Sequence, residues 1–157
     1  MGTSASITTG FNDLVLNGME EGMTRFRAVT VHLDGYYDTE HGVGQILLKY
    51  YNTQEKVDEL ISNGCMSTLR KEINPNPEEK HTFSRPQKDV CVFYYRDRGE
   101  DLTIYEYKNE EEMNYETCED YNYWFRDGKW YVKRYGDGSW NDLEKCIRNL
   151  NGRRVNT

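Results

Sequence analysis

Aromatic side chains stand next to cationic ones in two stretches of this sequence, residues 94–98 and 124–135. An exposed ring stacks on a nucleobase with about 1 to 3 kcal/mol per base, and a guanidinium binds phosphate through two parallel N–H groups. Because alternate residues of a strand face the same way, Tyr94 and Arg96 would share one side. These stretches predict ligand contacts from Tyr94, Arg96, Arg98, Trp124, Arg126 and Tyr135.

The same rings have a structural alternative, which is that they form the core of a small sheet. Aliphatic residues are modest in number, and aromatic residues make up 13% of the chain. Neighbouring residues of a strand face opposite sides, so adjacent ring pairs such as Tyr36-Tyr37 and Tyr94-Tyr95 cannot all point inward. Some tyrosines are therefore expected to be exposed, at a ligand site or at a contact between subunits.

A second set of polar residues follows the strand expected at 26–33. His32 and Asp34, with His41 further on, are side chains that bind iron or zinc. The alternative is that Asp34-Gly35 forms a turn and His32 packs on the sheet. His32, Asp34 and Tyr36 are also candidate ligand contacts at this strand end. Gly42 and Gly44 begin a helix whose free amides could receive a phosphate, or they allow close packing.

Composition limits the classes of function. The chain has 157 residues, 20 lysines and arginines, and 27 acidic residues, for a net charge of −7. Its length predicts one globular domain over residues 1–157. A net acidic surface excludes non-specific binding to nucleic acid or to anionic membranes, but leaves room for a small anion in a locally basic pocket. No apolar stretch approaches the roughly 18 residues of a membrane-spanning helix, and no signal peptide is recognised. The four cysteines contain no C-x-x-C pair and are expected to be free.

The expected elements are short. Strands are expected at residues 4–9, 26–33, 90–95 and 102–107, with a turn at 96–100, and 123–132 forms a hairpin around Asp127-Gly128. Turn points are expected at Asn17-Gly18 and Glu21-Gly22 within an N-terminal strand and loop at 1–25. Helices are expected at 42–51, 53–63, 110–118 and 141–150, and 74–88 is a proline-containing loop. The fold class is α+β: a small antiparallel sheet built from hairpins, packed against a helical hairpin and a C-terminal helix.

Several motifs resemble a widespread group of small tailed-phage proteins. The likeness covers about residues 26 to 145, and departs from the group's pattern at Tyr37, where a proline is usual, and in the long connection at 12–24. It is carried by Met1-Gly2-Thr3, His32-Leu33-Asp34-Gly35-Tyr36, Gly42-Val43-Gly44, Arg96-Asp97-Arg98-Gly99-Glu100 and the hairpin at 123–131. The resemblance implies a phage accessory protein that acts in the host cytoplasm, as viral nucleotide-sponge proteins do.

Three functions remain open from the sequence. The leading one is a counter-defence protein, expected to be a homo-oligomer, that sequesters a small linear or cyclic nucleotide without cleaving it and needs no cofactor. The second is an acidic inhibitor or nucleic-acid mimic that binds a host enzyme through Glu110–Glu112, Glu116, Glu119 and Asp120. The third is a hydrolase that depends on a metal or a cysteine, centred on His32, Asp34 and His41.

Overall fold

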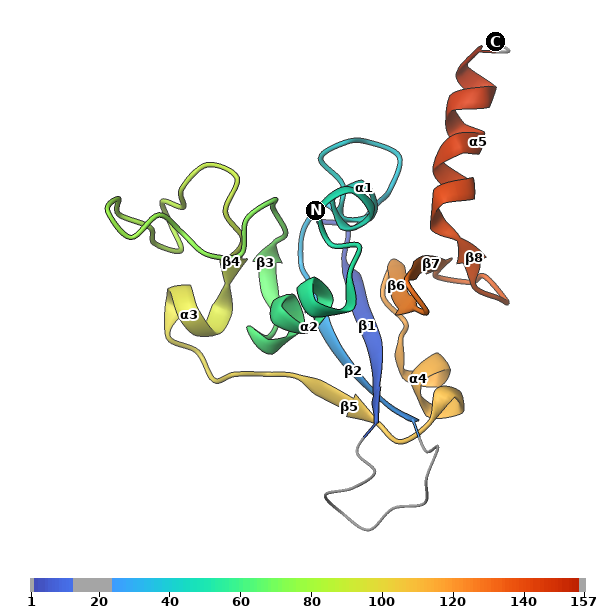
Figure 1. The fold of residues 1–157 in the computed structure, drawn as a ribbon, viewed down its shortest axis with the longest axis horizontal. Coiled ribbons are helices and arrows are strands. Elements are labelled where there is room, and N and C mark those ends of the chain that lie inside the picture. The colour runs from blue at the N-terminus through green and yellow to red at the C-terminus, as the bar shows by residue number, and fades with distance from the viewer. Residues whose placement is uncertain (1, 13–23, 156–157) are drawn as a thin grey trace.

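The computed structural model describes residues 2–12 and 24–155, and the expected turn points at Asn17-Gly18 and Glu21-Gly22 lie outside them. The element order is shown in Figure 1. The strands are β1 (Ala5–Asn12), β2 (Thr24–Val31), β3 (Met66–Thr68), β4 (Val92–Phe93), β5 (Tyr105–Tyr107), β6 (Tyr121–Arg126), β7 (Lys129–Arg134) and β8 (Asn141–Asp142). The helices are α1 (Val43–Tyr50), α2 (Gln54–Ser62), α3 (Tyr94–Arg98), α4 (Glu110–Glu116) and α5 (Leu143–Val155).

The described strands form one sheet in the order β4-β3-β2-β1-β6-β7-β8, and β5 pairs with β2 as well. The α+β class is confirmed, and most strand pairs are antiparallel. The sheet is not built from hairpins alone, because β1 pairs with β6 in parallel and β2 pairs with β3 in parallel. The expected hairpin of β6 and β7 is present, and its turn has Asp127 and Gly128 at positive φ, as a tight two-residue hairpin turn requires.

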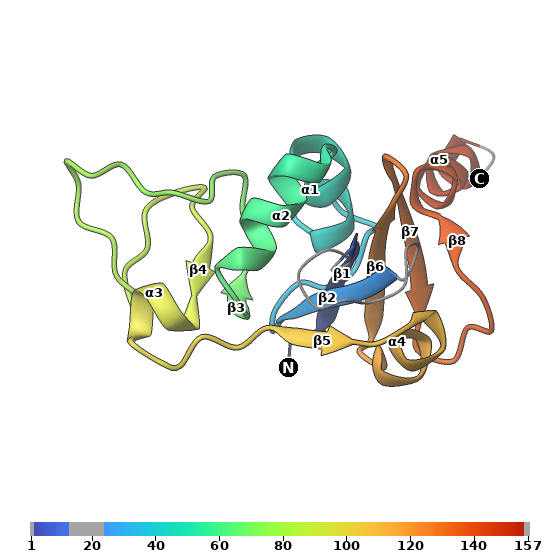
Figure 2. The same cartoon turned by 60° about the horizontal axis from the view of Figure 1, so that its bottom comes forward.

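The sheet is covered on both faces, which Figure 2 shows with α1 and α2 on one side and α4 on the other. The larger core lies under α1, α2 and α5 and includes Ile7, Tyr123 and Phe125. A smaller core on the opposite face joins Phe26, Met113 and Trp124. Consecutive rings of β6 can therefore both be buried, because each face of this strand has its own cover.

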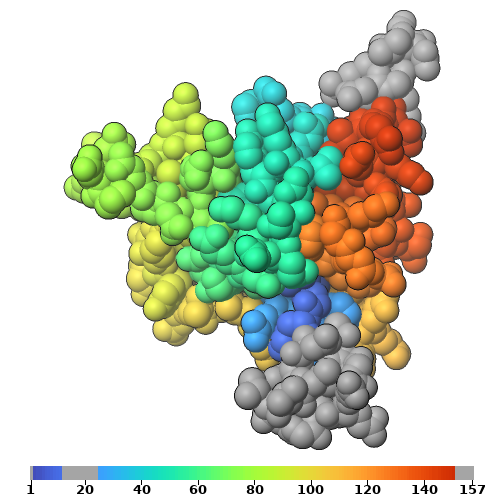
Figure 3. All heavy atoms as spheres, in the orientation of Figure 1, coloured from blue at the N-terminus to red at the C-terminus, as the bar shows by residue number. Residues whose placement is uncertain are grey.

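Two helices follow β2 and fill the middle of the face seen in Figure 3. The expected starts are confirmed: Thr53 caps α2 by accepting from the amide of Lys56, and Gly42 precedes α1. α1 lies against α5 and β7, while α2 lies over β1 and β2. Among the described residues, no helix has the length and apolar character needed to cross a membrane.

The segment from 90 to 107 differs from the sequence prediction. Residues 94–98 form helix α3 instead of a strand end and a turn, and β5 pairs with β2 instead of with 90–95. The Asp97 carboxylate accepts from the Phe93 amide at the start of the helix, and Gly99 ends it in the left-handed conformation, a usual helix terminus. The prediction failed because Arg-Asp-Arg-Gly is a helix end as well as a turn. At the other end of the chain, α5 continues through Gly152 to Val155 instead of stopping before it.

Candidate functional site

The residues predicted as one ligand site occupy separate parts of the fold. Tyr94, Arg96 and Arg98 belong to α3 at one edge of the sheet, and Trp124 and Arg126 belong to β6. Of the remaining candidates, His32, Asp34, Tyr36 and Gly42 lie between β2 and α1, and Gly44 lies in the first turn of α1. Tyr135 follows β7 with 76% of its surface exposed. The sequence predicted the strand that carries Trp124 and Arg126, but it placed residues 94–98 on a strand and a turn instead of in helix α3.

In α3, two of the predicted residues stack together and the third turns inward. The Arg98 guanidinium lies 4.8 Å from the centre of the Tyr94 ring and 4.4 Å from that of Phe83, and it pairs with Glu100. Arg96 donates to Asp97 and to the backbone carbonyls of Ile73 and Cys91. Its Nη2 also lies 3.2 Å from Nε2 of His81, so the guanidinium joins α3 to the 74–88 loop and to both segments that flank it.

His81 and Asp97 complete this loop attachment and are both nearly buried, with 4% of each side chain exposed. The Gln87 amide donates to Nδ1 of His81 at 2.9 Å, and Nε2 lies 3.3 Å from the Asp97 carboxylate and 3.2 Å from Nη2 of Arg96. Burial alone would raise the pKa of Asp97, but hydrogen bonds from Arg96, the Phe93 amide and His81 outweigh it and hold that pKa below its usual range. This cluster fixes the loop against α3.

Trp124 and Arg126 border a cavity of about 450 Å³ at the C-terminal end of β1. Trp124 is only 5% exposed and packs edge-on against Phe26 and Trp140, so its ring belongs to the smaller core. Arg126 lies over Trp124, with its guanidinium 5.1 Å from the ring centre, and pairs with Asp127 at 3.7 Å. Trp124 and Arg126 therefore already interact with each other and with neighbouring residues of the protein.

The segment between β2 and α1 is held by a dense set of backbone bonds. Asp34 has φ 60°, its carbonyl accepts from the Val43 amide at 2.8 Å, and its carboxylate accepts from the Tyr36 hydroxyl at 3.0 Å. That hydrogen bond, with smaller effects of burial and of the Asp34 charge, raises the pKa of Tyr36, so the phenol stays protonated as a donor. The exposed side chain of His32 points away from the sheet core, while its amide donates to Met66.

The two glycines of this segment serve packing. The amides of Gly42 and Gly44 donate to the carbonyls of Thr39 and Tyr36. A Cβ added to Gly42 would lie 2.3 Å from the Tyr36 carbonyl oxygen, and one added to Gly44 would lie 2.3 Å from Cβ of Tyr37. The sequence left two alternatives for these glycines, which were phosphate binding and close packing. The contacts match close packing, because both amides already donate to backbone carbonyls.

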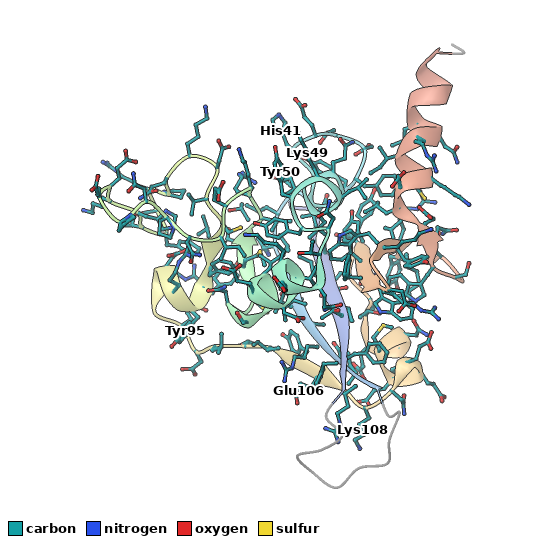
Figure 4. The ribbon with its side chains drawn as sticks, viewed as in Figure 1. His41, Lys49, Tyr50, Tyr95, Glu106 and Lys108 are labelled. Carbon is teal, nitrogen blue, oxygen red and sulfur yellow. The ribbon has the colours of Figure 1, made fainter. Side chains whose placement is uncertain are left out.

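A larger cavity, about 830 Å³ in volume, opens beside this segment. α1, the 70–71 segment and α5 form its walls, and Figure 4 labels three of its residues, His41, Lys49 and Tyr50, close together near α1. Its charged and polar lining includes Asp34, Tyr36, His41, Lys49, Arg70, Lys71 and Asp89, and its apolar lining includes Ile46, Leu48 and Ile147. We call it the α1 cavity.

Three cations line the α1 cavity without an ion pair to any carboxylate in the described ranges 2–12 and 24–155. Lys49, Arg70 and Lys71 form none of the ion pairs found within 4.0 Å in the part of the chain that the structure describes. The Nζ atoms of Lys49 and Lys71 lie 5.3 and 5.6 Å from the centre of the Tyr50 ring. These cations are not predicted from the sequence, because Arg70 and Lys71 have no aromatic neighbour in the chain and join Lys49 only in the folded structure. The signal available was Lys49 beside the Tyr50-Tyr51 pair.

Buried polar groups hold Arg70 and Lys71 at the cavity. The hydroxyl of Tyr51, which is 1% exposed, lies 2.7 Å from the Arg70 carbonyl and 3.1 Å from that of Lys71. The thiol of Cys91 accepts from the Arg70 amide at 3.2 Å, and burial raises the pKa of this thiol. Burial also raises the pKa of Tyr51, so both groups are neutral at pH 7.

Replacing Tyr51 with phenylalanine is expected to lower the free energy of unfolding by about 1 to 2 kcal/mol, because buried carbonyls then lose a donor. Urea unfolding followed by tryptophan fluorescence would measure this change. Tyr115→Phe is the matched control, since Tyr115 is 83% exposed. Equal stability of the Tyr51 variant and the wild type would show that the hydroxyl does not hold the 70–71 segment.

Three acidic residues of the second hypothesis, Glu112, Glu119 and Asp120, take part in local structure, whereas Glu110, Glu111 and Glu116 are exposed. Asn109 accepts from the amide of Glu112, and the Glu112 carboxylate accepts from that of Lys108, which is a reciprocal helix cap. Glu119 and Asp120 bind Ser4 at the start of β1. For the third hypothesis, the described residues contain no group of three or more histidine, cysteine or acidic side chains placed to hold a metal ion.

Comparisons of the chain with protein-family models, with curated proteins and with solved structures find no match. Nothing in them indicates an enzymatic activity.

Proposed function

We propose that the protein binds a small linear or cyclic nucleotide in the α1 cavity and sequesters it without cleaving it. The observation that carries this proposal is that Lys49, Arg70 and Lys71 line one cavity and form no ion pair within the described part of the chain, with both lysines beside the Tyr50 ring. The Arg70 guanidinium also donates to the Leu69 carbonyl. On a chain of net charge −7, three such cations at one cavity provide a local attraction for phosphate.

The volume and the walls of the cavity suit a ligand of this class. Small-molecule sites commonly enclose about 300 to 1,000 Å³ and combine apolar walls with a few polar groups, and the α1 cavity has about 830 Å³. Ile46, Leu48 and Ile147 offer apolar surface, and Tyr36 and Tyr50 offer rings on which a base can stack. The lysines bind phosphate as point charges, and Arg70 adds a planar donor group.

The acidic side chains of the cavity argue against a purely anionic ligand. Asp34, Glu40 and Asp89 line it together with the cations, so the ligand must also present hydrogen-bond donors. A nucleotide does so through its base and its ribose hydroxyls. The resemblance to small tailed-phage proteins supplies the setting that we propose, which is removal of a nucleotide signal of host immunity in the host cytoplasm.

Binding is tested by thermal unfolding of the purified protein with GMP, AMP, ATP, cyclic dinucleotides and inorganic phosphate. A ligand that binds only the folded state stabilises it by about 2.7 kcal/mol at a hundredfold excess over Kd. We expect a rise in Tm with at least one nucleotide, and chromatography of the released ligand should recover it intact. No shift with any nucleotide at millimolar concentration would contradict binding, and recovery of a hydrolysed ligand would contradict sequestration.

A further inference from the structure

Asp34 lines the α1 cavity with a carboxylate. It lies between β2 and α1, whereas the cations Lys49, Arg70 and Lys71 lie in α1 and in the 70–71 segment. Its backbone is in the left-handed region at φ 60°, which costs an ordinary residue of order 1 to 3 kcal/mol and persists only where surrounding contacts enforce it. Those contacts are the bond from the Val43 amide to its carbonyl and the bond from the Gly35 amide to the Thr3 carbonyl at 2.7 Å. These bonds fix the backbone from which the Asp34 carboxylate projects.

The hydroxyl of Tyr36 orients this carboxylate through the 3.0 Å bond to Oδ1. In the described part of the chain, no other donor and no cation contacts the Asp34 carboxylate within bonding distance. Two carboxylate oxygens offer about four acceptor positions, so most of them remain for a ligand. An ionised carboxylate accepts hydrogen bonds but donates none.

We infer that Asp34 makes the α1 cavity selective for a guanine base, with the phosphate held by the Lys49, Arg70 and Lys71 cluster. This inference rests on the proposed function. Guanine carries N1–H and N2–H donors side by side on its Watson–Crick edge, which matches the two oxygens of one carboxylate. Adenine carries an unprotonated N1 beside its amino group, so the same placement would set a lone pair against a negative charge.

Guanine selectivity has consequences for the strength of binding. Hypoxanthine keeps N1–H and lacks the N2 amino group, so IMP should lose one of the two charge-assisted bonds. A hydrogen bond to a charged group contributes about 1.5 to 3 kcal/mol, so IMP is expected to bind about 10 to 100 times more weakly than GMP. AMP, which also adds repulsion, should bind more weakly than IMP. Arg70 and Lys49 contact only the phosphate, which the three nucleotides share.

The test is isothermal titration of the full-length protein with GMP, IMP, AMP and inorganic phosphate. For the wild type we expect the affinity order GMP, IMP, AMP. Asp34→Asn replaces half of the acceptors by donors and should reduce the ratio of GMP to AMP affinity to near one, while phosphate binding stays within about twofold. Tyr36→Phe should reduce the same ratio partly. Asp101→Asn is the matched control, because Asp101 is exposed and lies beside the α3 and β5 segments.

The outcomes separate this inference from the proposed function. Equal affinity of the wild type for GMP and AMP, or an unchanged preference in Asp34→Asn, would overturn guanine selection and leave nucleotide binding intact. Absence of binding by any nucleotide would overturn both. A circular dichroism spectrum and a Tm of Asp34→Asn close to those of the wild type would show that any loss of preference is not a loss of folding.

Discussion

Replacing Lys49 and Lys71 together with glutamate should abolish nucleotide binding by the α1 cavity. Each substitution removes a cation and adds an anion at the Tyr50 ring, where both Nζ atoms lie within 6 Å of the ring centre. Like charges brought together at a binding site cost several kcal/mol, so we expect affinity to fall by about 100-fold or more. Titration calorimetry with GMP at low salt would measure the loss.

The matched control is the double replacement of Lys80 and Lys129 with glutamate. Both lysines are exposed, Lys80 in the 74–88 loop and Lys129 at the start of β7, and neither lines the α1 cavity. The two double variants have the same net charge, so a general effect of charge would weaken both equally. Wild-type affinity in the Lys49 and Lys71 variant, or equal losses in the two pairs, would contradict the location of the site. Rising salt should also weaken wild-type binding, because exposed charges are screened.

Replacing Asp97 with asparagine should produce the largest loss of stability among single substitutions discussed here. The Asp97 carboxylate accepts from the Phe93 amide, from Arg96 and from His81, and it is 4% exposed. Removing one partner of a fully buried charge pair costs about 3 to 5 kcal/mol, and the Arg96 side chain, which would be left, is 24% exposed. Arg96 would keep its bonds to Ile73 and Cys91, so we expect about 3 kcal/mol in a urea unfolding experiment at pH 7.

The contribution of Asp97 should depend on pH in a definite direction. Its pKa is lower in the folded chain than in the unfolded chain, so the unfolded state takes up the proton first as pH falls. The carboxylate therefore stabilises the fold fully above the unfolded pKa of about 3.9, and this stabilisation is lost as pH falls through the folded value below it. The stability difference between wild type and Asp97→Asn should shrink below about pH 4.

Asp97→Asn would also weaken the attachment of the 74–88 loop to α3, because the contact of Asp97 with His81 is lost while that of Arg96 with His81 remains. Glu100→Gln is the control, because Glu100 is an exposed carboxylate in the same segment, paired with Arg98. Equal stability of the wild type and the Asp97 variant at pH 7 would contradict a buried ion pair. An unchanged difference between pH 7 and pH 3 would contradict the lowered pKa. Hydrogen exchange of the Gln87 amide would report on the loop directly.

Elements with a strong local pattern were predictable from the sequence. The apolar spacing of Val57, Leu60 and Ile61 predicted α2, and Asp127-Gly128 between alternating runs predicted the hairpin of β6 and β7. Both depend on residues close together in the chain. The pairing of residues 102–107 was mispredicted for the opposite reason, because β5 pairs with β2, which joins residues about 80 positions apart. Helix α3 was missed for a local reason, since Arg-Asp-Arg-Gly is typical of a turn as well as of a helix end.

The candidate site divides in the same way. The sequence by itself determined the acidic net charge, the α+β class and the concentration of Asp34, Tyr36 and the two glycines at one strand end. Only the tertiary structure decided that Trp124 is a core ring and that Arg96 donates to the backbone carbonyl of Ile73. It also decided that Arg70 and Lys71 join Lys49 at a cavity. The physical reason is that the residue type determines which interactions a side chain can make. Long-range packing then determines which of these interactions are already made within the protein and which remain for a ligand.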